Sequence, residues 1–400
     1  MHIALWSPAW PLEKFQNGII TYVHWMKREL ESLGHRVSVF TGELDPSSAN
    51  EPGVHPVRRT HWNRAVSRFA RRWRSQAPDV FAYSALIAAE IRRVHRRDPI
   101  DVVEMEESFG WFADVGRLTS LPLVVKLHGP AFLSLVEDEL DTPFAREKID
   151  REGRALKLAT WIASPCASTL AQTIERYRLT PQDSRHIVLP LTMDADTPVW
   201  DLDTCDRNTI LFVGRFDLRK GADVVLKAFL SMLTRRRNLQ LIFAGPDRGL
   251  TLPDGQRVQF AAYRDALFPA ELRGRVDFLG PRGNREVAGL RTRAMATLVA
   301  SRWENPGYTL LEAMFQVCPV VSTDAGGCRE TVIDGVTARL ARSEDSDDFA
   351  AQLEAVLDDP SGAQAMGRAA RLQIMESYSA AAVAAATVEM YQNVIASHAR

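Results

Sequence analysis

The chain has 400 residues, more than one hydrophobic core usually organises, so we expect two domains. Its residues are 46% hydrophobic and 25% charged, as in globular proteins, and a net charge of -1 argues against a general nucleic-acid binder. The four cysteines are far apart and form no Cys-x-x-Cys pair, which favours free thiols in a reducing compartment over disulfides or a zinc site.

Short apolar runs alternate with helical segments along the first half of the chain. The run "HIALWS" is followed by "GIITYVHWMKRELESLG", which has helical spacing, and then by the apolar "HRVSVFTG". Further strands are predicted at "DVVEME" (101–106), "LPLVVKLHG" (121–129), "WIASP" (161–165) and "HIVLPL" (186–191). This alternation of strand and helix predicts a parallel sheet with crossover helices.

The N-terminus and one basic segment bear on location. "MHIALWSPAWPLEKF" lacks the pattern of a signal peptide, and no run of about 18 apolar residues occurs, so we expect a cytoplasmic protein. Residues 55–97 are rich in arginine and carry only two acids, with Trp62, Phe69 and Trp73 interleaved. Such a segment is either a solvated helix face or an amphipathic helix in peripheral contact with the inner face of the membrane.

Residues 196–208 lose this periodicity and are predicted to be a linker after an N-terminal domain at 1–195. The alternation then restarts with "TILFVGR", "ADVVLKAFLSMLTRR", "LQLIFAG", "VDFLG", "MATLVAS" and "CPVVSTD", which define a C-terminal domain at 209–376. A last helix at 377–400 is expected to return to the N-terminal domain. The predicted fold is α/β, with two Rossmann-like doubly wound domains, and such sheets bind ligands outside the carboxyl ends of their strands.

The first candidate motif is "LFVGRFDLRKGAD", a strand and a glycine turn with Arg215 and Lys220 just before a helix. Two cations near a helix N-terminus suit a diphosphate, because the free amides and the helix dipole add to their charge. Neither a Walker loop nor a G-x-G-x-x-G fingerprint is present. The alternative is that both cations only decorate a surface loop.

The second motif is "SRWENPGYTLLEAM". Pro306 and Gly307 interrupt the chain, so a helix is predicted from about Thr309, with Glu304 in the preceding loop and Glu312 in the first turn. A T-x-x-E capping box between Thr309 and Glu312 would explain Glu312 without any ligand. Capping leaves Glu304, at a strand end, without a structural role.

Weaker signals follow three other predicted strands. Gly326 and Gly327, in "VVSTDAGGCRETV", form either a turn or a place where the backbone approaches a ligand. His128 ends the strand in "VVKLHGPAF" and is either structural or catalytic. Asn17 and Gly18 open the first crossover helix, where they either cap it or offer amides to a phosphate.

Taken together, these motifs resemble a known family. "GRFDLRKG", "ENPGYTLLEAM" and "DAGGCRETV", in this order, are similar to the C-terminal half of the family-four retaining glycosyltransferases of GT-B fold, whose signature is Glu-x7-Glu. "HIALWSP", "LESLGHRVSVFT" and "KLHGP" extend the resemblance to the N-terminal half. The chain departs from the family at Asn17, where a second glycine is usual, at Asn305 and Pro306, and at Val317, where glycine is common.

The resemblance implies two domains facing a cleft that holds a UDP- or GDP-sugar, with no cofactor and no metal. Arg215 and Lys220 would hold the diphosphate and stabilise charge on the leaving group, Glu304 would face the donor sugar, and His128 would lie near the reacting sugar. Glu312 would accept hydrogen bonds from the ribose hydroxyls. The remaining donor contacts implied are the amides of Gly307, Tyr308 and Thr309, with Asn17 and Gly18 near the phosphate.

The activity implied is retaining transfer of a sugar to a hydroxyl, by front-face attack of the acceptor. The acceptor would be a glycan, a lipid-linked molecule or a small molecule, and the enzyme would act in the assembly of surface polysaccharide or glycolipid. Alternatives are a GT-B sugar-nucleotide epimerase and a non-catalytic two-lobed sugar-binding protein. A metal-dependent transferase would need an Asp-x-Asp at a strand end, but "DAD" (194–196) and "DLD" (201–203) lie in or beside the predicted linker.

Overall fold

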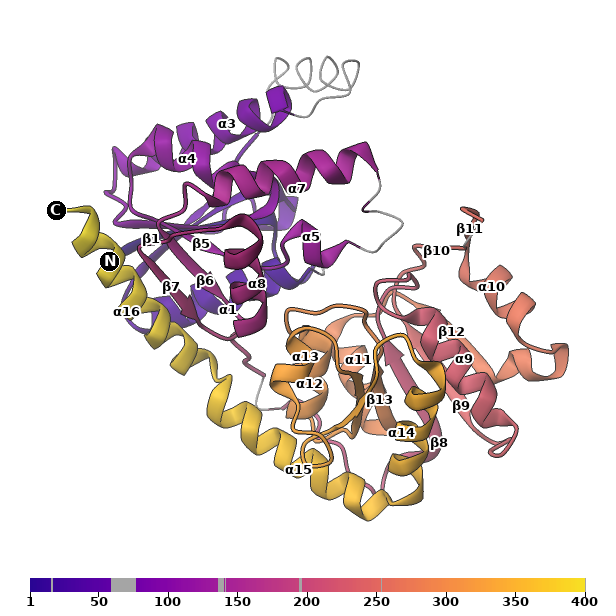
Figure 1. The fold of residues 1–400 in the computed structure, drawn as a ribbon. Helices are drawn as coiled ribbons and strands as arrows, with labels where there is room; N and C mark the ends of the chain where they lie inside the picture. The colour runs from indigo at the N-terminus through magenta and orange to yellow at the C-terminus, as the bar shows by residue number, and fades with distance from the viewer. Residues whose placement is uncertain are drawn as a thin grey trace. The chain divides into compact units, whose positions relative to one another are not determined.

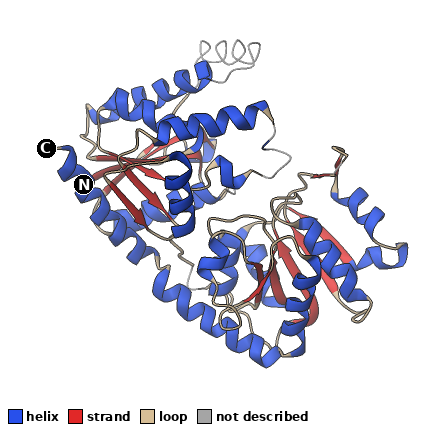
Figure 2. Ribbon diagram, in the orientation of Figure 1, coloured by secondary structure: helices blue, strands red, loops and turns tan. Residues whose placement is uncertain are grey.

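The computed structural model describes residues 1–15, 17–58, 77–135, 140, 142–193, 196–252 and 254–399. The chain forms two compact units, one made of Met1–Thr192 with Ser379–Arg400 and the other of Met193–Tyr378 (Figure 1). Each unit is a parallel sheet with helices packed on it (Figure 2). The predicted α/β class with two parallel-sheet domains is confirmed.

The first unit is built on a sheet with the strand order β3-β2-β1-β4-β5-β6-β7, in which every neighbouring pair is parallel. Its central strands β1 and β4 are buried along almost their whole length, because helices cover both faces of such a sheet. The strands are β1 (His2–Trp10), β2 (Arg36–Leu44), β3 (Val54–Pro56), β4 (Val102–Glu106), β5 (Leu123–Lys126), β6 (Trp161–Ser164) and β7 (Asp183–His186). The helices are α1 (Gly18–Ser32), α3 (Ala77–His95), α4 (Trp111–Thr119), α5 (Ala131–Ser134), α7 (Pro143–Leu156), α8 (Ala167–Tyr177) and α16 (Ala380–His398).

The strand predicted at 186–191 is wrong. The strand that pairs with β6 is β7, which ends at His186 where the prediction began. Ile187, Leu189 and Leu191 are buried in the connection that follows, where Leu191 forms only an isolated bridge with Ser379, so their apolar pattern reflects burial outside a regular strand. The backbone oxygen of Ile187 instead accepts a hydrogen bond from the Lys126 ammonium at 2.7 Å.

The second unit has a parallel sheet with the order β12-β9-β8-β13-β14-β15 and a small antiparallel pair, β10-β11. The strands are β8 (Asp206–Val213), β9 (Gln240–Ala244), β10 (Leu250–Thr251), β11 (Arg257–Val258), β12 (Val276–Gly280), β13 (Ala294–Val299), β14 (Val320–Thr323) and β15 (Arg339–Ala341). The helices are α9 (Ala222–Leu233), α10 (Phe260–Leu267), α11 (Asn284–Arg293), α12 (Tyr308–Phe315), α13 (Gly327–Thr331), α14 (Ser346–Asp358) and α15 (Pro360–Ser377). Strand β8 begins inside the predicted linker, because its polar first residue, Asp206, still pairs with β13.

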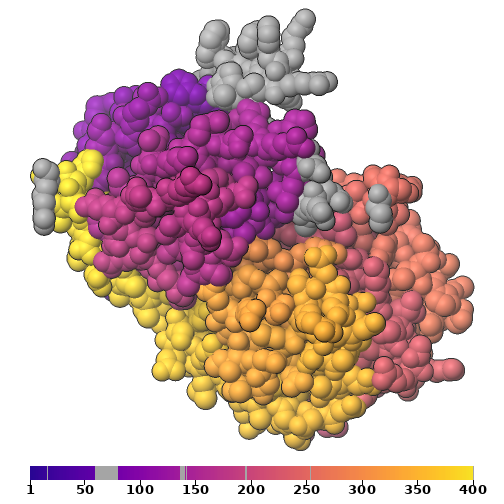
Figure 3. Space-filling model, viewed as in Figure 1, coloured from indigo at the N-terminus to yellow at the C-terminus, as the bar shows by residue number. Residues whose placement is uncertain are grey.

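The C-terminal helix α16 is part of the first unit, where it contacts α1 (Figure 1). Figure 3 shows its yellow atoms against the purple atoms of that unit. Ser379 caps its start, since the Ser379 hydroxyl accepts from the amide of Ala382. Tyr391 on α16 donates a hydrogen bond to the buried Glu104 carboxylate of β4 at 2.9 Å. This contact joins the last helix of the chain to the central strands of the first sheet.

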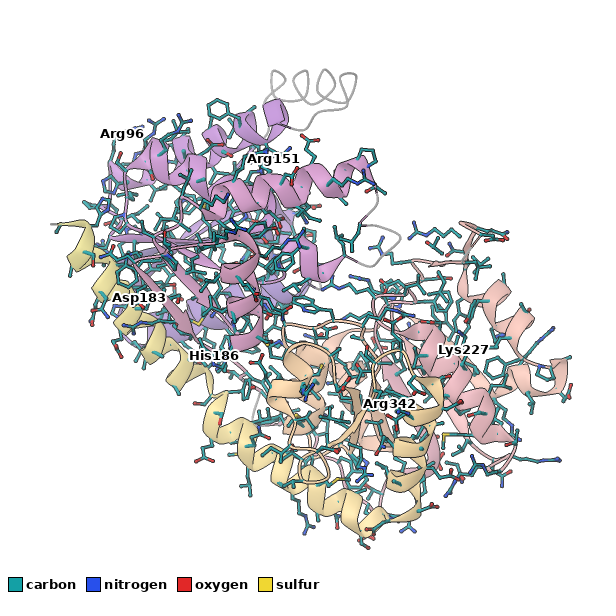
Figure 4. The ribbon with its side chains drawn as sticks, in the orientation of Figure 1. Arg96, Arg151, Asp183, His186, Lys227 and Arg342 are labelled. Carbon is teal, nitrogen blue, oxygen red and sulfur yellow. The ribbon has the colours of Figure 1, made fainter. Side chains whose placement is uncertain are left out.

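The structure bears on two expectations about location, the lack of a membrane span and the basic segment 55–97. In the described part of the chain, no helix is long and apolar enough to cross a membrane. Of the basic segment 55–97, residues 59–76 lie outside the described residues, and with them Trp62, Phe69 and Trp73. The described remainder includes α3 and the exposed Arg96 just after it (Figure 4). The four cysteines are free thiols.

Candidate active site

A glycine-bounded loop joins β8 to α9 and carries the two predicted cations. Asp217 braces this loop, because its carboxylate accepts from the Lys220 amide at 2.8 Å and from Arg215 Nε at 2.5 Å. The loop ends at Gly221, whose φ of +66° and position admit no side chain: a Cβ there would lie 1.8 Å from the oxygen of Ala300. The close approach brings Lys220 to the end of β13.

Glu304 lies at that strand end and is only 6% exposed. Its Oε1 accepts from the Lys220 ammonium and from the Ser301 hydroxyl, the latter at 2.7 Å. Burial alone would raise the pKa of Glu304. The Lys220 ammonium, and then the Arg219 guanidinium, oppose burial and outweigh it, so that the net shift of the pKa is downward. Glu304 is therefore an ionised carboxylate at neutral pH, held beside two cations.

The third motif packs against the backbone of Glu304. The amide of Gly327 donates to the Glu304 backbone oxygen at 2.7 Å, and a Cβ on Gly326 would lie 2.4 Å from that oxygen. A Cβ on Gly307 would lie 2.8 Å from Oε2 of the same glutamate. The three motifs that the sequence places at separate strand ends thus meet around one residue, and close packing explains these glycines.

Helix α12 begins at Tyr308, one residue before the predicted start, with Gly307 as its N-cap. The capping box between Thr309 and Glu312, the alternative explanation for Glu312, does not form, because Glu312 is the fifth residue of the helix and its carboxylate bonds elsewhere. A glycine N-cap has no side chain that could accept from the first amides, so those of Tyr308 and Thr309 are available at the positive end of the helix dipole.

Glu312 is paired with an arginine that the sequence analysis missed. Arg291, on α11, donates from Nη2 to Glu312 Oε2 at 2.6 Å. The helix α11 precedes β13 in the chain, and nothing local in "GLRTRAM" distinguishes this arginine from a surface residue. Only the pairing of β13 with β8 and β14 brings α11 and α12 together.

The predicted residues of the first unit are placed at two loops. Asn17 caps α1 by accepting from the amide of Ile19 at 2.8 Å, and Gly18 is the first residue of that helix. His128 follows β5, and its ring packs edge-on against Tyr22, with ring centroids 4.9 Å apart. Burial, and then the Lys126 ammonium, lower the pKa of His128, so its imidazole is neutral at pH 7.

The backbone at His128 is held by a buried acid that the sequence analysis did not single out for this role. Glu107 accepts from the amides of His128 and Gly129 at 2.8 and 2.7 Å. Burial raises the pKa of Glu107 to about 8, with further contributions from the charges of Glu152 and Glu106. This carboxyl fixes the loop that presents His128.

Of the two Asp-x-Asp pairs, the structure describes the pair Asp201 and Asp203 in full. Asp201 is exposed and accepts from the amide of Asp203 at 2.8 Å, a local turn contact. Asp194 of the other pair lies outside the described residues. Within the described ranges, no group of three or more His, Cys, Asp or Glu side chains is arranged to hold a metal ion.

Two family models match the chain. Residues 17–192 match the glycosyl transferase 4-like domain, and residues 202–373 match the glycosyl transferases group 1. Between them, the matches cover most of both units.

Relatives in sequence and solved structures are consistent with these two family matches. A D-inositol 3-phosphate glycosyltransferase of Arthrobacter sp. (strain FB24) is 28% identical over 94% of this chain and 90% of its own, and the alpha-D-kanosaminyltransferase of Streptomyces kanamyceticus is 25% identical over 70% and 72%. Sucrose-phosphate synthase from Thermosynechococcus elongatus has a similar fold, with a TM-score of 0.72, 19% identity and 99% coverage of both chains. Anabaena Alr3699/HepE, in complex with UDP-glucose, has a TM-score of 0.71 and 16% identity, with 98% of this chain and 100% of its own covered.

The two parallel-sheet units and these likenesses define a glycosyltransferase of the GT-B fold. The chain belongs to the group 1 glycosyltransferases.

Proposed function

We propose that this glycosyltransferase transfers a sugar from a nucleotide-diphosphate sugar to a hydroxyl acceptor, with retention of configuration and without a metal. The observation that carries the proposal is the ion pair of Lys220 with Glu304 at the carboxyl ends of β8 and β13, with Arg215 held by Asp217 on the same β8–α9 loop as Lys220. The open N-terminus of α12 lies directly after Glu304 in the same cluster. Cations and amides gathered in this way match a ligand with a diphosphate in its middle.

The chemistry that this cluster supports is the departure of a nucleoside diphosphate. When the glycosyl–phosphate bond breaks, negative charge grows on the phosphate oxygens. Fixed cations and amides aimed at that charge supply much of the rate enhancement, because they need no reorganisation during the reaction. Lys220 and Arg215 provide the cations, Asp217 fixes both through the loop, and α12 provides the amides.

Retention is proposed to occur by front-face attack, with the departing phosphate accepting the proton of the acceptor hydroxyl. Glu304 is a poor candidate for a covalent nucleophile, since Lys220 and Ser301 both bond its Oε1 and its pKa is lowered. We assign it instead to hydrogen bonds with donor-sugar hydroxyls. His128, neutral because burial lowers its pKa, is assigned to a sugar hydroxyl as well.

Donor and acceptor classes are proposed from the relatives. The Anabaena protein has been crystallised with UDP-glucose and with UDP, and starch synthase IV from Arabidopsis thaliana was bound to ADP and acarbose. UDP- and GDP-sugars remain our first donors, with ADP-sugars added to the test. The acceptor is proposed to be a glycan, a lipid-linked molecule or a small molecule such as an inositol phosphate, in cell-surface polysaccharide or glycolipid assembly in the cytoplasm.

Thermal unfolding tests the donor site directly. The protein is melted with UDP, GDP or ADP and their sugar conjugates, all with excess chelator. A nucleotide at a hundred times its dissociation constant should stabilise the folded protein by about 2.7 kcal/mol. A rise in melting temperature only after manganese is added would refute metal independence, and no rise with any nucleotide would refute the donor site.

A further inference from the structure

Arg291 is the largest fully buried side chain among the described residues, with 1% of its surface exposed. A guanidinium is costly to bury unless acceptors compensate it. Two acceptors do so here: Nη2 donates to Glu312 at 2.6 Å and Nη1 donates to the side-chain oxygen of Gln316 at 3.0 Å. The arginine fork therefore spans one turn of α12 and is held at both prongs.

The second prong is anchored more rigidly than the first. Gln316 is itself fully buried, and its amide nitrogen donates to the backbone oxygens of Pro198 at 2.8 Å and Ala288 at 3.2 Å. These two bonds fix which end of the Gln316 amide faces Arg291. Because Nη1 of Arg291 is held by this buried amide, the planar guanidinium has one orientation, in which Nη2 points toward Glu312.

Glu312 differs from its partner in exposure. Its side chain is 24% exposed, against 2% for the side chain of Arg291, so one side of the carboxylate reaches the surface of the unit. Oε2 is occupied by Arg291, whereas Oε1 has no hydrogen-bond partner within the described ranges. The carboxylate thus offers one free acceptor oxygen in a direction that the buried arginine determines.

Tyr308 points to a ligand at the same place. Its hydroxyl is buried without a partner in the described part of the chain, and the charge of Glu312 acts on it. Buried donors without acceptors are rare, so this hydroxyl beside a half-free carboxylate suits a ligand with hydroxyl groups.

We propose that Arg291 is a positioning residue for the donor: it holds the Glu312 carboxylate in one rotamer, so that Oε1 accepts from the ribose hydroxyls of a nucleoside diphosphate. This inference rests on the proposed function, because it takes the donor nucleotide as the ligand. Arg291 does not touch the nucleotide itself. It acts through Glu312, since a charged and preorganised acceptor forms stronger hydrogen bonds with hydroxyl groups.

The test measures how well each variant distinguishes ribose from dideoxyribose. Isothermal titration of the full chain uses the nucleoside diphosphate that stabilises it most among UDP, GDP and ADP, and the 2′,3′-dideoxy form of the same nucleotide. We expect the wild type to prefer the ribose form by about 10²-fold, the value of one or two hydrogen bonds to a charged group. The preference of Arg291→Gln should fall to about tenfold or less, and that of Arg291→Lys should lie between them.

Trp200→Phe is the matched control. The Trp200 indole donates to the backbone oxygen of Ala294 at 2.7 Å, and the Trp200 backbone amide donates to the backbone oxygen of Gln316. The variant therefore removes a buried hydrogen bond near Gln316 without changing Glu312. It should keep the full preference for ribose. In turnover, Arg291→Gln should raise the KM for the donor by about tenfold and change kcat by less than about threefold.

A merely structural role would lower affinity for both nucleotides equally. If Arg291→Gln keeps the wild-type preference while its affinity falls, the inference is overturned and the proposed function stands. If the wild type binds none of the nucleotides, the proposed function fails, and the inference fails with it. If Arg291→Gln does not fold, Arg291→Lys decides by the same ratio, and an unchanged preference again overturns the inference.

Discussion

Replacing Glu304 by glutamine isolates the charge at the centre of the site, because the side chains have nearly the same shape. The amide oxygen can still accept from Ser301, but the charged bond to Lys220 is lost. A hydrogen bond between charged groups contributes about 1.5–3 kcal/mol. Since the Lys220 side chain is 22% exposed and water compensates it in part, we expect a loss of about 2 kcal/mol at pH 7. That is about 4–8 °C in the melting temperature of a unit of this size.

The pH dependence follows from the direction of the pKa shift. The pKa of Glu304 is lowered from 4.5 in the folded protein, so the ionised carboxylate contributes its full stability above that value. The contribution disappears as the pH falls through the lower, folded pKa. Glutamine does not titrate, so the difference in stability between wild type and Glu304→Gln should be largest near neutral pH and shrink in acid.

Calorimetric melting at pH 7 and in steps down to about pH 3.5 measures this difference, together with turnover at pH 7. Turnover should fall by about 10²-fold, as it does when a contact to a charged transition state is removed. Glu344→Gln is the control, because Glu344 is 62% exposed and pairs with Arg302 at 3.0 Å, so its loss should cost under about 1 kcal/mol. Equal melting of Glu304→Gln and wild type at pH 7 with full turnover, or a difference that grows in acid, would refute the reasoning.

Three further predictions concern the loop, the last helix and the basic segment. Gly221→Ala should abolish stabilisation by nucleotides in a thermal melt, because a Cβ there would lie 1.8 Å from a backbone oxygen. Gly289→Ala is the control, since a Cβ there would have no neighbouring atom within 4 Å, and it should keep the stabilisation. Equal responses of the two variants to nucleotides would contradict this prediction. Tyr391→Phe should destabilise the first unit by about 1–3 kcal/mol, because the buried Glu104 carboxylate loses one hydrogen-bond donor. Proteolysis should then release the C-terminal helix faster than in the wild type, and an unchanged rate of proteolysis would count against this prediction. If 55–97 contacts membranes, the protein should sediment with vesicles of anionic lipid and be released by about 0.5 M salt, whereas equal sedimentation with neutral vesicles would exclude an electrostatic contact.

The parts of the site that could be predicted from the sequence are those that a strand end fixes locally. Lys220 and Glu304 are 84 residues apart, yet each follows a strand of one parallel sheet, and the carboxyl ends of such strands lie along one edge. Which strands are neighbours is a separate matter. That β8 pairs with β13 is a long-range contact, and nothing in "TILFVGR" or "MATLVAS" indicates it.

The parts that could not be predicted are the long-range partners of charged residues. Arg291 occurs in a polar stretch of α11, and its burial follows from packing of α11 beside α12. The T-x-x-E pattern, the alternative explanation for Glu312, does not form a capping box for the same reason: Glu312 bonds a buried arginine that the local sequence does not reveal. The strand predicted at 186–191 failed because apolar residues in a buried connection have the same pattern as a strand.

The most direct test of the account is the configuration of the product. With excess chelator and the donor identified by thermal unfolding, proton NMR follows the anomeric signal during transfer to a panel of acceptors that begins with D-inositol 3-phosphate. The account predicts that nucleoside diphosphate is released and that the newly formed glycoside keeps the anomeric configuration of the donor, with both lost in Lys220→Ala. A product of inverted configuration, or transfer that starts only when a divalent metal is restored, would contradict it.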